Sequence, residues 1–234
     1  MTAIDQVDPK KPLFDQFSEV AKAFAHGHRL ALLEVLAQDE RDVNTLSRTT
    51  GLSVANASQH LKVLRSAGLV TCRRAGKHTL YALADDTVVD LVRSLRAFAE
   101  RHNDAARQTV LTHWPGLRDH MEVSRETLSG WIADDTVALL DTRPLEEFRA
   151  SHIHGSLHVP KGAADTVLPL LAGKPHIVAY CRGAYCASLH ETLDYLHQKG
   201  RPAARLEDGF AEWRAAGYPV VRPGEGSGDA GAGP

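Results

Sequence analysis

The chain has 234 residues, of which 43% are hydrophobic and 24% are charged. These are the values of a globular protein, and the length allows two domains of ordinary size. No apolar run approaches the roughly 20 residues that a membrane helix needs, so we expect no membrane partner. The N-terminus lacks the apolar core of a secretory signal, and three cysteines are too few for a disulfide framework. We therefore expect a cytoplasmic protein.

The formal net charge of −2 conceals a basic segment. Between Thr45 and Ala84 there are six cationic residues and no acidic residue, which leaves 21 cationic and 29 acidic residues to the rest of the chain. Forty residues without a carboxylate inside an acidic protein indicate a surface that binds phosphate groups.

Apolar residues recur at helical spacing from Phe14 to Ala37, and Gly27 predicts a break around residues 26–28. The pattern then predicts helices over residues 43–50 and 54–67, followed by a hairpin with strands over residues 69–74 and 78–83. Ser53 is expected to cap the second of these helices, and Gly68 to end it. A long helix is predicted over residues 86–114, with an apolar stripe on one side.

The helix predicted over residues 54–67 has one apolar face, formed by Ala57, Leu61 and Leu64. The opposite face offers amide side chains that can bond adenine bidentately, and cations that can hold phosphates. The hairpin behind this helix adds a basic wing. The residues expected to contact DNA are Ser53, Asn56, Ser58, Gln59, His60, Lys62, Arg65, Arg73, Arg74 and Lys77.

Two stretches, FAHGHRLALLEVLAQ and TTGLSVANASQHLKVLRSAGLVTCRRAGKHTLYALAD, closely resemble the ArsR/SmtB family of winged-helix repressors over about residues 15–100. The resemblance implies a homodimer that binds a palindromic operator in double-stranded DNA. In that dimer the first and last helices of the domain pack across the two-fold axis. The apolar stripe on the predicted helix over residues 86–114 independently requires a partner.

The resemblance does not extend to the metal sites of that family. Arsenic-sensing members carry closely spaced cysteines in the helix before the recognition helix, where this chain has the sequence VNTL. The last helix offers three potential ligands, but they do not have the spacing of the family's zinc site: His102, Asp104 and His113. Cys72 lies on a wing strand, where we expect it to pack as a small apolar side chain. We predict no metal site, no cofactor and no ligand site in the N-terminal half.

The C-terminal half alternates strands with helices, which predicts an α/β domain with a parallel sheet. The strand HIVAY is followed by the loop CRGAYC and an amphipathic helix. Backbone N–H groups at such a strand-to-helix junction favour an anion and lower the pKa of a thiol. Cys181 is therefore the predicted nucleophile, and Arg182 is a candidate for attracting anionic donors. The predicted loop residues are Cys181, Arg182, Gly183, Ala184, Tyr185 and Cys186.

The segments LLDTRPLEEFRASHIHGSLHVP and LEDGFAEWRAAGYPV resemble the rhodanese family over about residues 123–222. The resemblance implies that Cys181 accepts the outer sulfur of thiosulfate, a persulfide or a polysulfide and passes it to an acceptor. Single-domain rhodaneses often end this loop with arginine, whereas this chain has Cys186. That second thiol is placed to resolve a persulfide or sulfenic acid on Cys181. The sequence leaves open whether the two sulfur atoms are linked.

These observations predict a two-domain protein, in which a mainly α-helical winged helix-turn-helix precedes a rhodanese-like α/β domain. The predicted boundaries are a disordered lead-in over residues 1–12, a DNA-binding and dimerisation domain over 13–115, a linker over 116–122, the rhodanese-like domain over 123–222 and a flexible tail over 223–234. We expect a transcriptional repressor that responds to reactive sulfur species through Cys181. The alternatives are a sulfurtransferase enzyme that regulates its own expression and, less favoured, an arsenic- or metal-responsive repressor.

Overall fold

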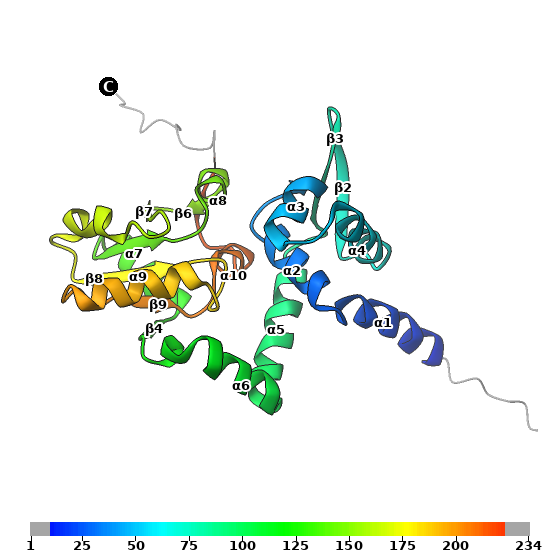
Figure 1. The fold of residues 1–234 in the computed structure, drawn as a ribbon, viewed down its shortest axis with the longest axis horizontal. Helices are drawn as coiled ribbons and strands as arrows, with labels where there is room; N and C mark the ends of the chain where they lie inside the picture. Colours follow the sequence, from blue (N-terminus) through cyan, green and yellow to red (C-terminus); the bar gives the residue numbers. More distant parts are fainter. Residues whose placement is uncertain (1–9, 223–234) are drawn as a thin grey trace, which may run out of the picture. The chain divides into compact units, whose positions relative to one another are not determined.

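The computed structural model describes residues 10–222 and divides the chain into two compact units, Met1–Val88 and Val89–Pro234 (Figure 1). Residues 1–9 of the predicted lead-in and the whole predicted tail over residues 223–234 lie outside the described residues. Among the helices that the structure describes, none combines the length and apolar character required to cross a membrane.

The first unit is built from helices and a small antiparallel sheet (Figure 1). Its elements are α1 (Lys11–Phe24), α2 (Gly27–Leu36), β1 (Arg41–Asp42), α3 (Val43–Thr50), α4 (Val54–Ser66), β2 (Val70–Ala75) and β3 (His78–Leu83). The strand order is β1-β3-β2, and Leu32, Leu46, Leu61 and Leu64 are fully buried between the helices and the sheet. This is the predicted helix-turn-helix with a hairpin wing.

Local chemistry explains the ends of these elements. Helix α1 begins at Lys11, within the lead-in predicted to be disordered, because Pro12 occupies the first turn of a helix, where its missing N–H has no cost. The Nδ1 atom of His26 accepts the N–H of His28 and caps α2. Ser53 caps α4 as predicted, through the N–H of Asn56 at 3.2 Å.

The prediction of a single long helix over residues 86–114 is wrong. The structure has two helices, α5 (Thr87–His102) and α6 (Asp104–His113), separated at Asn103. Asn103 has an extended backbone, and its side chain accepts the N–H of Ala106, which caps α6. From Val89 onward both helices belong to the second unit, whereas the sequence analysis assigned them to the DNA-binding domain.

The second unit contains a five-stranded parallel sheet with the strand order β4-β9-β8-β5-β7. The strands are β4 (Glu122–Val123), β5 (Val137–Asp141), β7 (Ser156–His158), β8 (His176–Tyr180) and β9 (Ala204–Leu206). Four α-helices and two 3-10 segments accompany the sheet in the part of this unit that follows α6: η1 (Pro115–Arg118), α7 (Arg125–Ala133), α8 (Leu145–Ala150), η2 (Ala164–Leu171), α9 (Ala187–Gln198) and α10 (Phe210–Ala215). An antiparallel pair joins β6 (His152–Ile153) to β10 (Val220–Val221).

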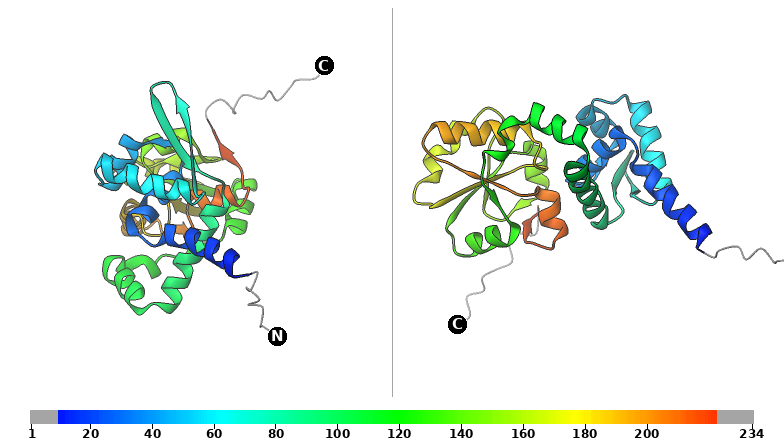
Figure 2. Two further views of the ribbon diagram at one scale, coloured as in Figure 1. Left: turned by 90° about the vertical axis from the view of Figure 1, so that its right-hand side faces the viewer. Right: turned by 90° about the horizontal axis from the view of Figure 1, so that it is seen from below.

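Alternate residues of the central strands enter two separate cores, one on each face of the sheet. Helices cover both faces of this sheet (Figure 2). One core packs α9 and η2 against residues that include Ile177, Ala179 and Cys181. The other packs α7 and α10 against residues that include Val178 and Tyr180. The last residues of β8 therefore point in opposite directions.

The order of the strands determines where a ligand can meet this sheet. From β5 the chain moves to β7 on one side and then returns to β8 on the other side of β5. Loops diverge at such a switch point, so the carboxyl ends of β5 and β8 form the usual binding crevice of an open α/β sheet. Cys181 directly follows β8 at this position.

A buried ion pair lies under the same crevice. Asp141, the last residue of β5, accepts hydrogen bonds from Arg143, including one of 2.6 Å from Nη2, and both side chains are fully buried. The Tyr180 hydroxyl donates to the same carboxylate at 2.6 Å. Burial alone would lower the pKa of Arg143, but the hydrogen bonds and charge of Asp141 raise it.

Removing Asp141 should destabilise the second unit strongly. In Asp141→Ala the buried guanidinium loses its counter-charge, a loss of about 3–5 kcal/mol in the free energy of unfolding. All three tryptophans, Trp114, Trp131 and Trp213, belong to this unit, so denaturant unfolding followed by tryptophan fluorescence reports it selectively. The exposed Asp165→Ala is the matched control, and an equal effect of both substitutions would contradict this account.

Candidate functional site

The loop between β8 and α9 contains a disulfide between Cys181 and Cys186, whose Cα atoms are 6.3 Å apart. This separation lies inside the range that a disulfide can span without moving the backbone. Cys186 also occupies the N-cap position of α9. The structure thus answers the question that the sequence left open, because the two thiols are close enough to bond and are bonded.

In this oxidised state Cys181 is not the ionised, reachable thiol that the sequence analysis expected. Its sulfur atom is in the disulfide, and the residue is only 2% exposed among the apolar side chains beneath α9. Cys186 is half-buried and is the more exposed of the two. Because thiol exchange requires access to a sulfur atom, an external thiol reaches this disulfide most easily at Cys186.

Arg182 does not face the loop as an anion-attracting group. Its Nε atom donates to both carboxylate oxygens of Glu147 at 3.0 Å, and its Nη2 atom bonds the same carboxylate. Glu147 lies on α8 and is buried. The charge of Arg182 is thus neutralised within the protein. The Arg182–Glu147 ion pair joins the loop to α8, and the guanidinium is not free to attract an anionic sulfur donor.

A close backbone contact sets the path of the loop. The N–H of Phe210 donates to the carbonyl oxygen of Cys181 at 3.0 Å, which joins the loop to the start of α10. At Gly209 a Cβ atom would overlap the carbonyl oxygen of Arg182 and lie 2.7 Å from the backbone nitrogen of Gly183. Only glycine fits here, and this is the physical reason for the glycine in the closing segment of the rhodanese-like sequence.

A methyl group at Gly209 should therefore displace the loop. We expect Gly209→Ala to lower the free energy of unfolding of the second unit by about 1–3 kcal/mol, the usual cost of overpacking. Tryptophan-detected denaturation measures this loss. Gly130→Ala on α7 is the control, because a Cβ there meets nothing within 4 Å and a helical alanine is favoured over glycine. If both variants were equally stable, the steric argument would fail.

The loop is also bonded to α5. The Tyr185 hydroxyl, within the loop, donates to a carboxylate oxygen of Glu100 on α5. The pKa of Tyr185 is raised well above its ordinary value, first by burial and then by this hydrogen bond. The Trp114 ring, after α6, lies against the Tyr185 ring with centroids 5.1 Å apart.

Arg96, one turn before Glu100, extends the same contact. Its Nη2 atom donates to Asp208 at 2.9 Å, and its Nη1 atom lies 3.6 Å from the carboxylate of Glu212. Burial raises the pKa of Glu212, whose other oxygen accepts the N–H of Gly209. These contacts join residues about 85 to 116 positions apart in the chain, so no local sequence pattern could have revealed them.

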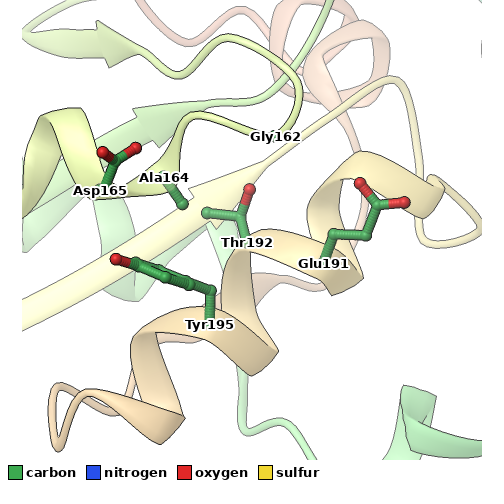
Figure 3. A pocket seen from close by; sticks show the side chains of 6 residues that line it. All are labelled: Gly162, Ala164, Asp165, Glu191, Thr192 and Tyr195. Atoms are coloured by element: carbon green, nitrogen blue, oxygen red, sulfur yellow. The ribbon is translucent and has the colours of Figure 1, made fainter.

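Two cavities lie beside α9 in the second unit. One, of about 350 Å³, lies between α9 and the start of η2, and is lined by Gly162, Ala164, Asp165, Glu191, Thr192 and Tyr195 (Figure 3). The other, of about 260 Å³, is lined by residues that include Trp114, Ala187 and His190. The lining of neither cavity includes Cys181 or Cys186.

The residues predicted to contact DNA lie in the first unit, on α4, at its N-cap and on the wing. All ten are exposed except His60, which is half-buried. Burial, followed by the charges of His26 and His28, lowers the pKa of His60. The apolar face of α4 is buried as predicted, since Ala57, Leu61 and Leu64 have no exposed area.

Two of the basic residues have protein partners. Arg73 forms an ion pair with Glu40, with Nε 2.8 Å from Oε2. Arg65 donates to the sulfur atom of Cys72, the free cysteine, at 3.4 Å. Arg73 must therefore exchange or share its carboxylate partner if it is to hold a phosphate, which makes it a weaker candidate than Arg74 or Lys77.

Comparison with known proteins gives two family matches. Residues 26–71 match the arsR family of bacterial regulatory proteins, and residues 124–216 match the rhodanese-like domain. The first match contains α3 and α4, and the second contains β5, β8 and the disulfide loop.

Individual relatives agree with these matches. An HTH-type transcriptional regulator of Mycobacterium tuberculosis, Rv0324, is 38% identical over 218 residues, covering 92% of this chain and 94% of the relative. The HTH-type transcriptional repressor SmtB of the same species is 35% identical over 97 residues, covering 42% of this chain and 70% of the repressor. A solved structure of the homodimeric winged helix-turn-helix DNA-binding domain of Mb0332 from Mycobacterium bovis is 38% identical, with a TM-score of 0.40, and covers 44% of this chain and 94% of that fragment.

Proposed function

Because this chain belongs to the ArsR family of bacterial transcriptional regulators and carries a rhodanese-like domain, we propose that it is a repressor whose DNA affinity is controlled by the sulfur chemistry of the Cys181–Cys186 loop. The observation that carries the proposal is that the loop holds two bondable thiols and is itself bonded to α5 through Tyr185. Helix α5 follows β3 of the wing after three residues, so the helix to which the loop is hydrogen-bonded is continuous in the chain with the DNA-binding unit.

The chemistry proceeds in two exchanges. The Cys181 thiolate attacks the outer sulfur of a persulfide R–S–SH, giving Cys181–S–SH and the thiolate R–S⁻. The Cys186 thiolate then attacks the Cys181 Sγ atom, which forms the Cys181–Cys186 disulfide and releases HS⁻. The sulfane sulfur is the oxidant, and it leaves as sulfide. A polysulfide reacts in the same way with a shorter polysulfide as the leaving group.

The disulfide state is linked to α5 through the residues between the two cysteines. Tyr185 precedes Cys186 and bonds Glu100, while Gly183 lies near Arg96, whose Nη1 atom would be 3.5 Å from a Cβ placed there. Closing or opening the disulfide changes the constraint on this four-residue segment. A change in its bonds to α5 then gives the two redox states different DNA affinities, as a coupling between two sites requires.

We further propose that the protein works as a homodimer. Helix α1 exposes Leu13, Phe14 and Phe17, and α5 exposes Leu91, Leu95 and Phe98. Large apolar side chains clustered on one helix indicate a protein interface. The proposed interface uses α1 and α5, which correspond to the first and last helices of the winged-helix domain that the family resemblance implies.

Sulfurtransferase activity is the second candidate function, and the rhodanese-like domain favours it. Two features of the loop argue for slow turnover: Cys186 occupies the position that arginine often holds, and Arg182 is neutralised by Glu147. Steady-state formation of thiocyanate from thiosulfate and cyanide, lost in Cys181→Ser, would support an enzyme.

The first test measures DNA affinity before and after sulfur loading. Reduced protein should bind its operator, isolated by selection from random duplexes, and polysulfide should weaken this binding by about 5- to 150-fold, the usual range of coupling between sites. Cys181→Ser should bind the operator in both conditions, because it cannot accept sulfur. Cys72→Ser should behave like the unsubstituted protein, and a matching loss of response in that variant would refute the assignment to Cys181.

A second test separates sulfur chemistry from its transmission. Glu100→Ala removes the acceptor of the Tyr185 hydroxyl but leaves both loop cysteines intact. Intact-mass analysis should still show disulfide formation after polysulfide treatment, while the change in operator affinity should shrink several-fold. Asp90→Ala removes an acid from the same helix whose ion pair, with Arg93, stays within α5. A full response in Glu100→Ala would show that the signal does not pass through this contact.

A further inference from the structure

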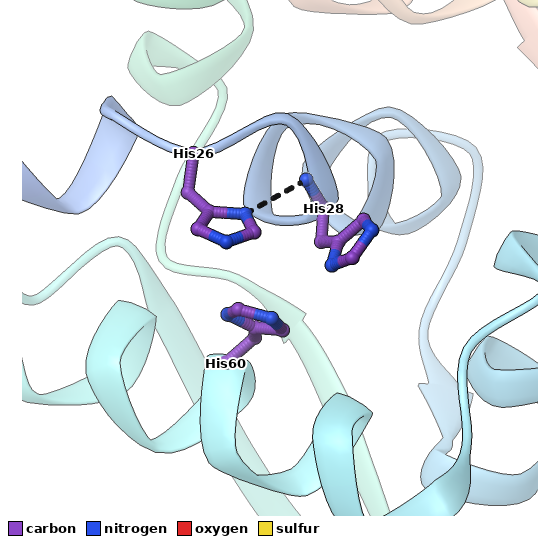
Figure 4. Close-up of side chains that lie close together, drawn as sticks. All are labelled: His26, His28 and His60. Carbon is purple, nitrogen blue, oxygen red and sulfur yellow. Dashed lines mark hydrogen bonds between the residues drawn. The ribbon is translucent and has the colours of Figure 1, made fainter.

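We propose that His26, His28 and His60, which converge between the start of α2 and the recognition helix α4, form a binding site for a divalent transition-metal ion of the zinc type (Figure 4). This site is separate from the disulfide loop and does not depend on the proposed response to sulfur. Among the described residues it is the one group of three or more potential metal ligands whose ligand atoms lie close together.

The three rings are close to the spacing that a metal ion requires. One ring nitrogen of each histidine lies within 4.8 Å of the others, and the ring centroids are 4.5, 4.9 and 5.4 Å apart. Zinc bonds nitrogen at about 2.0–2.1 Å, which places two ligands of a tetrahedral ion about 3.4 Å apart. Small rotations of the side chains therefore suffice, and the backbone does not need to move. His26 and His28 are exposed, so an ion has a path of entry.

The ligand set selects the class of ion. Three imidazoles without a carboxylate or thiolate suit zinc, nickel, copper and cobalt and do not suit magnesium or calcium, which prefer oxygen. A water molecule would complete a tetrahedral site. Arg29 lowers the affinity because its positive charge acts on His60. We therefore expect micromolar binding, weaker than that of a structural zinc site with thiolate ligands.

Binding at His26 competes with the capping of α2. The Nδ1 atom of His26 now accepts the N–H of His28 at 3.1 Å, so its neutral ring carries the proton on Nε2. When Nε2 binds a metal ion, the proton moves to Nδ1, and the ring can no longer accept that N–H. The metal–nitrogen bonds must therefore outweigh the loss of this cap.

An ion at this site would affect the recognition helix directly. His60 follows Gln59 on α4 and is itself among the residues predicted to contact DNA, while His26 and His28 belong to the start of α2. The ion would join these two helices and add two positive charges beside the predicted DNA-binding face. The site lies neither in the helix before the recognition helix nor on the last helices, where the sequence analysis looked for metal ligands.

The test uses the full chain in its oxidised form, treated with chelator and then freed of it, so that the disulfide keeps Cys181 and Cys186 from binding metal. Zinc is titrated by calorimetry, and cobalt is titrated by its visible absorption, which identifies a tetrahedral nitrogen-ligated ion. We expect one ion per chain, and a loss of affinity of about tenfold or more in His28→Gln, since one of three protein ligands is removed.

Controls separate this site from adventitious binding. His78→Gln removes an exposed histidine from the wing of the same unit and should bind zinc like the unsubstituted protein. His26→Gln should reproduce the effect of His28→Gln, and circular dichroism should show that both variants keep the native helix content. Absence of binding at 100 µM zinc, or equal affinity in His28→Gln and His78→Gln, would overturn the proposal.

Discussion

The second unit depends on the neutralisation of one buried charge. Arg143 lies inside the protein with no exposed side-chain area, and Asp141 supplies its counter-charge at the end of β5. The guanidinium also donates to the carbonyl oxygen of Ser151 and lies over the Phe210 ring, 3.7 Å from its centroid. These bonds join β5, the segment after α8 and the start of α10. Without the carboxylate the guanidinium would be buried without this counter-charge, a state far more costly than either a complete ion pair or none.

This network determines the direction in which Cys181 points. Tyr180 turns its hydroxyl toward Asp141 on one face of the sheet, so the alternation along β8 turns Cys181 toward the other face, beneath α9. The loop must then bend sharply to begin α9 at Ala187, and Gly209 leaves room for its backbone. The two cysteines consequently lie within bonding distance, and Tyr185 projects toward α5. The buried bonds around Asp141 thus also determine where the two cysteines of the loop lie.

The two candidate ligand sites of the chain use different chemistry in different units. The loop in the second unit has two sulfur atoms, and the proposed signal there is an electron-accepting sulfur species. The histidine cluster in the first unit has three borderline-soft nitrogen ligands and no sulfur, which suits a metal ion. Because the sites share no residue, each can be removed without changing the other. A regulator built in this way can combine a covalent signal with a reversible one at the same operator.

Local patterns in the sequence determined the helix-turn-helix, the wing, the parallel α/β class and the position of Cys181, because each follows from periodicity, caps and turns among neighbouring residues. The break at Asn103 carried a local signal, an asparagine suited to capping, which the long apolar stripe obscured. Only the tertiary structure decided that Arg182 pairs with Glu147, that Tyr185 bonds Glu100, and that His60 meets His26 and His28. These contacts join residues tens of positions apart, and their partners are selected by the packing of whole elements, which no local pattern encodes.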